Sequence, residues 1–206
     1  MFHHSWFVET DYQDADTVLE NPLVTVLLPT YNSEAYIADT IDSVLRQTFT
    51  NFEVLIINEY GSTDATLDFV NVFNDNRISV IQNQHRLGLA ESLNLGLREA
   101  RGKYVARIDA DDICSPERFA KQVDFLEKNP DYGLCGSWQH HFGADTDMVH
   151  EVPIKHADLQ AQLLYRCELC HSTLMLRRSV FVDNNLFYDA SCAAEDYELW
   201  TRAVYK

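Results

Sequence analysis

The stretch Tyr104–Asp112 (YVARIDADD) decides the fold, because it reads as a buried strand that runs directly into three carboxylates. An apolar interior is typical of a strand in a parallel sheet, where helices cover both faces. In open α/β sheets ligands bind at the carboxyl ends of the strands, which is where Asp109, Asp111 and Asp112 would lie. Acids this close together repel one another unless a positive group lies among them. The simplest such group is a divalent metal that bridges the acids to a phosphate-bearing substrate, and the alternative is an acidic surface loop.

Size and composition limit the classes of protein that need to be considered. The chain has 206 residues, enough for one domain with a substantial core, and its hydrophobic content of 46% favours a globular fold over disorder. Its formal net charge of -16 argues against nucleic acid or an anionic membrane surface as a partner. An acidic protein still binds a diphosphate if a metal or a few local cations help it.

The ends of the chain and its cysteines bear on location. No apolar run approaches the ~20 residues that span a bilayer, so we expect no transmembrane segment. The start, Met1–Trp6, lacks the basic and apolar regions of a signal peptide, and we expect residues 1–22 to form an acidic leader. Five cysteines, an odd number without an export signal, indicate reduced thiols in a cytoplasm.

Strands and helices alternate over the first part of the chain. Apolar runs predict strands at 24–28, 54–57, 78–81 and 104–108, the first of them stopped by Pro29. Helical patterns follow at 37–45, 64–73, 89–100 and 119–126, with Ser33 as a cap of the first and Ser115-Pro116 at the start of the last. Consecutive βαβ units predict a parallel sheet with right-handed crossovers.

The second part of the chain has a different pattern. We expect strands at 134–138, 147–152 and 172–176 and helices at 157–165 and 195–205. The first part should bind a nucleotide-like ligand, and the second part should complete the site.

Six motifs in order along the chain resemble those of glycosyltransferase family 2. They are Val24–Asn32 (VTVLLPTYN), Ser43–Thr48 (SVLRQT), Gly61–Asp64 (GSTD), Gly88-Leu89-Ala90 with Asn94 and Gly96, Asp109–Asp112 (DADD), and Glu195-Asp196. Any one of them alone would be a weak signal, whereas the ordered set covers about Leu23 to Tyr205.

The resemblance implies a single α/β domain of the Rossmann-like GT-A fold over residues 23–206, with a mostly parallel central sheet flanked by helices. Residues 23–128 would bind the nucleotide sugar, and the mixed half 129–206 would hold the acceptor and the catalytic base. The implied reaction moves a sugar with inversion from a nucleoside diphosphate, with a UDP-sugar favoured, and uses Mn²⁺ or Mg²⁺. A glycan or glycolipid acceptor of cell-surface polysaccharide synthesis is expected, handled in the cytoplasm or peripherally at the inner membrane face.

The acids receive roles from the same resemblance. Asp111 matches the direct metal ligand, and Asp109 would face the ribose or hold a metal-bound water. Ala110 lies in the same nucleotide-sugar motif, and Asp112 would steady the loop. Asp196, with Glu195 beside it, is the candidate general base that takes the proton of the acceptor hydroxyl; ordinary first-turn acids favoured by the helix dipole are the alternative.

The nucleotide base would be cradled by Pro29, Thr30 and Tyr31, where similar transferases hold it. The next motif departs from the pattern, because family members commonly have Asp-Asp before Gly-Ser and this chain has Asn58–Tyr60 (NEY). Glu59 could accept a hydrogen bond from the base edge with one more methylene. The departure leaves the identity of the base open.

Two cations and one histidine complete the candidate site. Arg86 and Arg107 would meet phosphate or ribose, or else form structural ion pairs. His171 would line the wall of the site. It ends a C-x-x-C-H spacing (167–171) typical of haem attachment or half a zinc site, but with no export signal and no further ligands we expect no cofactor there.

Other classes of function remain open beside the enzyme. A degenerate GT-A domain could bind nucleotide or act as a regulatory module without turnover, as Asn58–Tyr60 would allow. A nucleotidyltransferase would need a glycine-rich loop that residues 29–33 lack, and a receiver domain would not explain Glu195-Asp196. Because similar transferases continue well past this motif, we expect a truncated domain or a short protein that depends on a partner, such as a homo-oligomer or a larger assembly.

Overall fold

The computed structural model describes residues 21–143 and 146–205, so the expected leader lies almost wholly outside the described residues. The elements in chain order are β1 (Val24–Thr30), α1 (Ile37–Leu45), β2 (Phe52–Asn58), α2 (Thr66–Val72), β3 (Ile78–Gln82), α3 (Leu89–Glu99), β4 (Tyr104–Arg107), α4 (Arg118–Lys128), β5 (Leu134–Cys135), β6 (Gln139–Gly143), β7 (Thr146–His150), α5 (His156–Gln162), the 3₁₀ turn η1 (His171–Thr173), β8 (Met175–Arg177), α6 (Arg178–Asp183) and α7 (Glu195–Val204).

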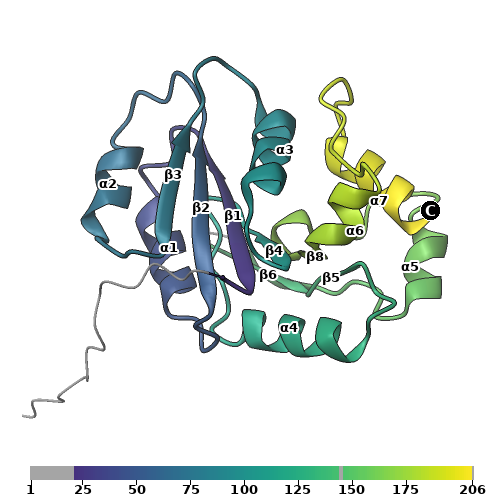
Figure 1. Ribbon diagram of the computed structural model, residues 1–206. Coiled ribbons are helices and arrows are strands. Elements are labelled where there is room, and N and C mark those ends of the chain that lie inside the picture. Colours follow the sequence, from purple (N-terminus) through teal and green to yellow (C-terminus); the bar gives the residue numbers. More distant parts are fainter. Residues whose placement is uncertain (1–20, 144–145, 206) are drawn as a thin grey trace, which may run out of the picture.

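A six-stranded sheet in the order β3-β2-β1-β4-β8-β5 forms the centre of the molecule (Figure 1). The strands β1 to β4 are parallel, and β8 runs antiparallel to both of its neighbours, β4 and β5. The predicted α/β class with a mostly parallel sheet is therefore confirmed. A separate hairpin pairs β6 with β7. β7 agrees with the strand predicted at 147–152, whereas β6 was not predicted.

Alternate residues of β1 feed two apolar layers, one on each face of the sheet, because side chains of a strand point to opposite faces in turn. Val24, Val26 and Leu28 pack in a layer with the helices α1, α2 and α4. Leu27 packs in the other layer, which holds α3 and residues of α6 and α7. Covered on both sides, β1 and β2 are buried at every position, which explains why most of their residues are apolar.

The expected stop at Pro29 is wrong, because β1 continues to Thr30. The N–H and C=O of one residue in a parallel strand point to the same neighbour, and successive residues alternate. Leu27 O accepts from Ile108 N on the β4 side, whereas Thr30 O accepts from Glu59 N on the β2 side. Pro29 therefore faces the β4 side, where strand pairing has already ended, and its missing N–H removes no bond of the ladder.

Two expected helix caps are also wrong, although both helices lie where the apolar patterns predict them. α1 begins at Ile37 rather than next to Ser33, whose carbonyl accepts the Ile37 N–H at 3.0 Å within the preceding turn. α4 begins at Arg118, after Ser115-Pro116. The Ser115 carbonyl accepts from Arg118 N at 3.0 Å and from Gln47 Nε2 at 2.6 Å, so this segment fastens α1 to α4 instead of opening a helix.

The strands expected in the second part are shorter than predicted. The strand at 134–138 is reduced to β5, and the one at 172–176 is displaced to β8, with Ser172 in η1. Thr173 Oγ1 lies 3.1 Å from both N and O of Ser137, so a side chain occupies backbone groups that strand pairing would use. Helix α7 agrees with its prediction, whereas α6 was not expected. No helix in the described ranges is long and apolar enough to cross a membrane.

Candidate active site

The carboxyl ends of β1, β2 and β3 are joined into one edge by side-chain and backbone bonds. Thr30 Oγ1 donates to Asn58 Oδ1 at 3.0 Å, and the Asn58 carbonyl accepts from Asn83 N at 2.9 Å. The acids after β4 follow at the same edge, because β4 is parallel to β1. This edge is where open α/β sheets bind ligands.

Two of the predicted nucleotide-binding residues meet at this edge. Tyr31, directly after β1, is partly exposed, and the Arg86 guanidinium lies 5.5 Å from the centre of its ring. Such a stack orients both side chains. An aromatic face and a cation are thus placed together where β1 ends, although they come from loops far apart in the sequence.

Glu59 is buried, and backbone N–H groups surround its carboxylate. It accepts from Tyr60 N at 2.7 Å, from Leu87 N at 3.1 Å and from Gly88 N. Burial by itself would raise the pKa of Glu59, but these backbone bonds together lower it, so the group stays ionised. Gly88 has φ +79°, a conformation that favours glycine. Glu59 therefore fastens the turn before α3 to the end of β2, and a contact between Glu59 and the base stays a prediction.

The adjacent Tyr60 is 57% exposed, and it stands directly before the Gly61-Ser62 turn. The sequence pattern drew attention to the departure at this motif but not to the side chain that faces solvent. Tyr60 is therefore better placed than Glu59 to meet a ligand from this loop.

The acidic loop after β4 is held from two sides. Asp109 N donates to Ser172 Oγ at 2.9 Å, and the Ala110 carbonyl accepts from Thr40 Oγ1 at 2.9 Å. Asp112 N donates to the Asp109 carbonyl at 3.3 Å. Asp111 is exposed, and its carboxylate has no hydrogen bond or ion pair to any residue within the described ranges. The backbone of the loop is fixed, and one carboxylate is left facing outward.

The fully buried Arg107 lies beneath this loop and forms an ion pair with the Asp109 carboxylate. Its Nε is buried and has no partner among the described residues. The positive group expected among the acids is thus partly supplied by the chain itself. Arg107 thus forms an ion pair, and a contact of Arg107 with phosphate or ribose stays a prediction.

No group of three or more His, Cys, Asp or Glu side chains is arranged to hold a metal ion in the part of the chain that the structure describes. The oxygen donors present nevertheless fit a hard cation such as Mg²⁺ or Mn²⁺, which is held through one or two carboxylates plus substrate phosphates and waters. Asp111 offers an unpaired carboxylate, and Asp109 offers an oxygen beyond its ion pair with Arg107.

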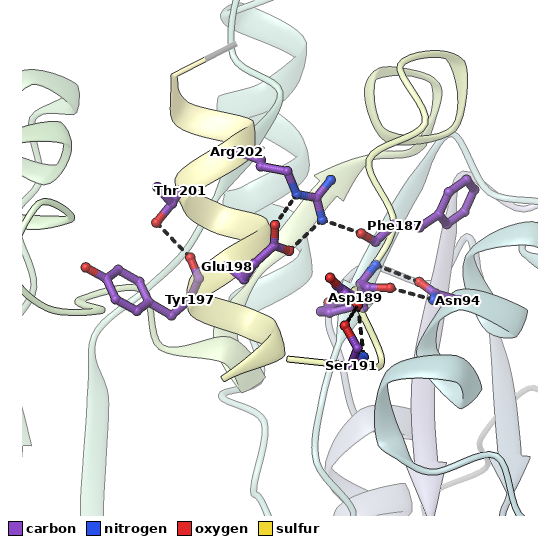
Figure 2. A network of polar contacts seen from close by, with 9 residues as sticks. Asn94, Phe187, Asp189, Ser191, Tyr197, Glu198, Thr201 and Arg202 are labelled. Atoms are coloured by element: carbon purple, nitrogen blue, oxygen red, sulfur yellow. Dashed lines mark hydrogen bonds and ion pairs between the residues drawn. The ribbon is translucent and has the colours of Figure 1, made fainter. Parts of the chain in front are cut away.

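The other acids of the candidate site stand in the first turn of α7. Glu195 and Asp196 open this helix, and Asp196 Oδ1 accepts from Tyr197 N at 2.7 Å. Arg202 in the same helix bonds Glu198 and the Phe187 carbonyl, and so ties α7 to the loop that leads into it (Figure 2). The position of Asp196 therefore depends on the loop 187–194.

His171, which is partly buried, and Tyr188, which is buried, are in contact beside the acidic loop. The Tyr188 hydroxyl lies 2.9 Å from His171 Nε2, and the Trp200 ring packs on both. Desolvation, assisted by Arg107, lowers the pKa of His171 well below its ordinary value. Burial raises the pKa of Tyr188, so the phenol keeps its proton beside the imidazole of His171.

Charged groups from both halves of the chain influence the pKa of the Tyr188 phenol. Arg107 opposes the effect of burial on the pKa of Tyr188, whereas Asp196, Glu195 and Asp109 raise it further. The acid after β4 and the acids at the start of α7 are thus near enough to one centre to influence it. Sequence reasoning found His171 and the acids but missed Tyr188, which no motif marks.

The chain belongs to glycosyl transferase family 2, whose family model matches residues 25–184. An uncharacterized glycosyltransferase of Haemophilus influenzae is 36% identical over 197 residues, which cover 89% of this chain and 61% of that protein. The Escherichia coli UDP-Glc:alpha-D-GlcNAc-diphosphoundecaprenol beta-1,3-glucosyltransferase WfgD is 30% identical over 182 residues, which cover 88% of this chain and 70% of that protein. The chain thus spans about two thirds of the length of these relatives.

Solved structures support the fold. S. aureus TarS 1-349 in complex with UDP-GlcNAc superposes with a TM-score of 0.72 at 24% identity, over 88% of this chain and 53% of that one. The mannosyltransferase PcManGT from Pyrobaculum calidifontis, in complex with GDP-Man and Mn²⁺, gives a TM-score of 0.67 at 22% identity, over 89% of this chain and 52% of that one. The chain has the GT-A fold.

Proposed function

We propose that this chain moves a sugar, with inversion, from a nucleoside-diphosphate donor to an acceptor hydroxyl, and that the donor is a UDP-sugar. The observation that carries the proposal is the acidic loop at the carboxyl edge of the sheet, because its backbone is held by Ser172 and Thr40 while the Asp111 carboxylate is exposed, as a site for a metal-bound diphosphate requires. Family membership and the ligands of the structural relatives, UDP-GlcNAc and GDP-Man, support a nucleotide-sugar donor.

The donor nucleotide is assigned to the edge formed by β1 and β2. Pro29, Thr30 and Tyr31 would cradle the base, with the Tyr31 ring held by Arg86 for stacking. Glu59 would keep the neighbouring turn in place. The division of the chain into a donor half (23–128) and an acceptor half (129–206) is part of this proposal.

The diphosphate is assigned to the acidic loop. Asp111 and Asp109 would hold a divalent cation, Mn²⁺ or Mg²⁺, which offsets negative charge on the leaving diphosphate when bound. Ala110 lies between them with its carbonyl fixed by Thr40, and Asp112 steadies the turn. Arg107 would hold the Asp109 carboxylate in place.

The base is assigned to Asp196. Its carboxylate would take the proton of the acceptor hydroxyl as that oxygen attacks the anomeric carbon from the face opposite the diphosphate. Glu195 beside it adds negative charge, and His171 forms part of the wall. Inversion needs no covalent intermediate, so one base and a stabilised leaving group are sufficient.

The acceptor is proposed to be a glycan or glycolipid of cell-surface polysaccharide synthesis, in keeping with the name of WfgD. A lipid-linked acceptor would bring the enzyme to the inner face of a membrane. We propose that location, on the cytoplasmic side, for this chain.

A second candidate function is nucleotide binding without turnover. It is favoured by Asn58–Tyr60, where the Glu59 carboxylate is already engaged by backbone N–H groups. Such a domain would bind a nucleotide at the same edge and act as a regulatory module.

Calorimetric titration of UDP with and without Mn²⁺ tests the donor site. We expect metal-dependent binding that Asp111→Asn abolishes and that Asp124→Asn keeps, because Asp124 lies exposed on α4, paired with Lys128 at 2.8 Å. Failure of UDP to bind under either condition would refute the UDP donor, and GDP and dTDP would be titrated next. Binding without transfer from any UDP-sugar would favour the second candidate.

A further inference from the structure

Asn94, a buried residue in the middle of α3, contacts the backbone of the segment that leads to Asp196. Asn94 Nδ2 donates to the Tyr188 carbonyl at 2.9 Å, and Tyr188 N donates to Asn94 Oδ1 at 2.8 Å. Figure 2 shows the Asn94 side chain directed at the loop of Phe187 and Asp189. A carboxamide offers one donor and one acceptor side by side, which matches the C=O and N–H of a single residue.

The helix that carries Asn94 is firmly fixed to the donor edge of the sheet. Glu59 binds the turn before α3, and Asn83 Nδ2 donates to Ser92 Oγ at 2.8 Å. A Cβ added to Gly96 would lie 2.1 Å from Cδ1 of Leu27 in β1, so glycine lets the helix lie close against the sheet. The Asn94 carboxamide is therefore placed with reference to β1, β2 and β3.

The residue that Asn94 holds touches the rest of the candidate site. The Tyr188 hydroxyl lies 2.9 Å from His171 Nε2. Ser172, which follows His171 in the chain, accepts the Asp109 N–H at 2.9 Å. Tyr188 also begins the segment that ends at Asp196. Asn94 thus fixes the position of Tyr188. Tyr188 is connected to the acidic loop through His171 and Ser172, and to the proposed base Asp196 through the segment that follows it.

Asn94 is only 2% exposed. Water therefore cannot replace these two hydrogen bonds at low cost if they are lost. We propose that Asn94 is a positioning residue for catalysis, which sets Asp196 relative to the donor edge by binding Tyr188. This inference rests on the proposed function. It assigns Asn94 no contact with substrate.

A matched control exists on the same helix. Arg178 of α6 donates from Nε to the Leu97 carbonyl at 3.1 Å and from Nη2 to the Arg98 carbonyl at 3.0 Å. Like Asn94, this tether joins α3 to the second half through backbone groups. It acts on the last turn of α3, far along the helix from the donor edge, and touches no residue of the candidate site.

The experiment compares Asn94→Ala with Arg178→Ala by hydrogen exchange, UDP titration and transfer rate from a UDP-sugar. For Asn94→Ala we expect the Tyr188 amide to exchange ~10-fold faster. We also expect turnover per folded molecule to fall by ~10–100-fold, since small misplacements of catalytic groups have such effects. UDP affinity should be unchanged. Arg178→Ala should change neither the exchange of residues 187–194 nor turnover.

Several results would overturn the inference. They are unchanged exchange at Tyr188 in Asn94→Ala, a turnover loss that only follows the folded fraction, or an equal turnover loss in Arg178→Ala. If Asn94→Ala does not fold, Arg202→Ala opens the same loop at Phe187 and should give the same three results.

An unaltered chain that binds UDP but transfers no sugar refutes the proposed function and the catalytic role of Asn94 together. An active unaltered chain with a fully active Asn94→Ala refutes this inference alone.

Discussion

The halves 23–128 and 129–205 differ in how their structure is maintained. In the first half, the adjacent strands β1 and β2 are buried at every position and layered by helices on both faces. In the second half, α5 has no buried residue, and β6 and β7 form an isolated hairpin whose side chains are all at least partly exposed. The edge proposed for the donor is thus built on fully buried strands.

The second half contributes to the candidate site through a few contacts instead. Ser172, His171 and Tyr188 join it to the acidic loop, and Arg202 ties α7 to the segment before it. The difference teaches that the proposed nucleotide site at β1 and β2 can stay intact when α7 and the loop before it are disturbed. Four predictions test this separation.

The largest effect is expected from Asp196→Asn. Loss of the general base should lower turnover by ~10²–10⁴-fold. UDP affinity, measured by calorimetry, should not change, because α7 lies outside the donor edge. Glu195→Gln, one residue away, should cost less turnover. A joint loss of UDP binding and turnover in Asp196→Asn would contradict the separation of the halves.

Truncation of leucines should distinguish the two halves by stability. Leu93 of α3 is fully buried, and Leu93→Ala should lower the free energy of unfolding by ~2–5 kcal/mol. Leu164, in the second half, is 62% exposed. Leu164→Ala should change the free energy of unfolding by no more than ~0.5 kcal/mol. Urea denaturation measures both values. Equal losses would mean that Leu164 is covered in solution.

Close packing of α3 on β1 predicts a cost for Gly96→Ala. Overpacking of a core costs ~1–3 kcal/mol, and the better helix propensity of alanine returns ~1 kcal/mol of it. We expect a net loss of up to ~2 kcal/mol in unfolding free energy. In a double-mutant cycle, Leu27→Ala should relieve the loss that Gly96→Ala causes. Strict additivity of the two changes would show that the helix does not press on Leu27.

The smallest effect concerns pH and His171. Its pKa is lowered in the folded state, so its contribution to stability is fully present above the unfolded pKa of about 6.5 and is lost as the pH falls below it. Between pH 7 and 6 the expected loss is less than ~1 kcal/mol. His171→Leu should remove this part of the slope when unfolding free energy is measured against pH. A parallel profile in both proteins would show that the pKa of His171 is the same in the folded and the unfolded chain.

Local patterns sufficed for much of the first half. Apolar runs located β2, β3 and β4 to within two residues at either end. β2 and β4 are buried at every position, as expected of strands covered on both faces, whereas β3 is an edge strand and is only partly buried. Helix starts were less predictable. Ser33 and Ser115 look like caps, but their carbonyls are used in turns that join distant segments. In the second half, short strands such as β5 depend on partners that the sequence pattern does not specify.

The sequence by itself determined the fold class, the family and the order of the acidic motifs, since these follow from periodicity and from residues adjacent along the chain. Tertiary structure alone decided the contacts between segments far apart. It placed the Glu59 carboxylate against the backbone N–H groups of Leu87 and Gly88, and it joined Asn94 to Tyr188 across 94 positions. These bonds depend on how closely α3 and α7 approach the sheet, and only the packed layers fix that approach.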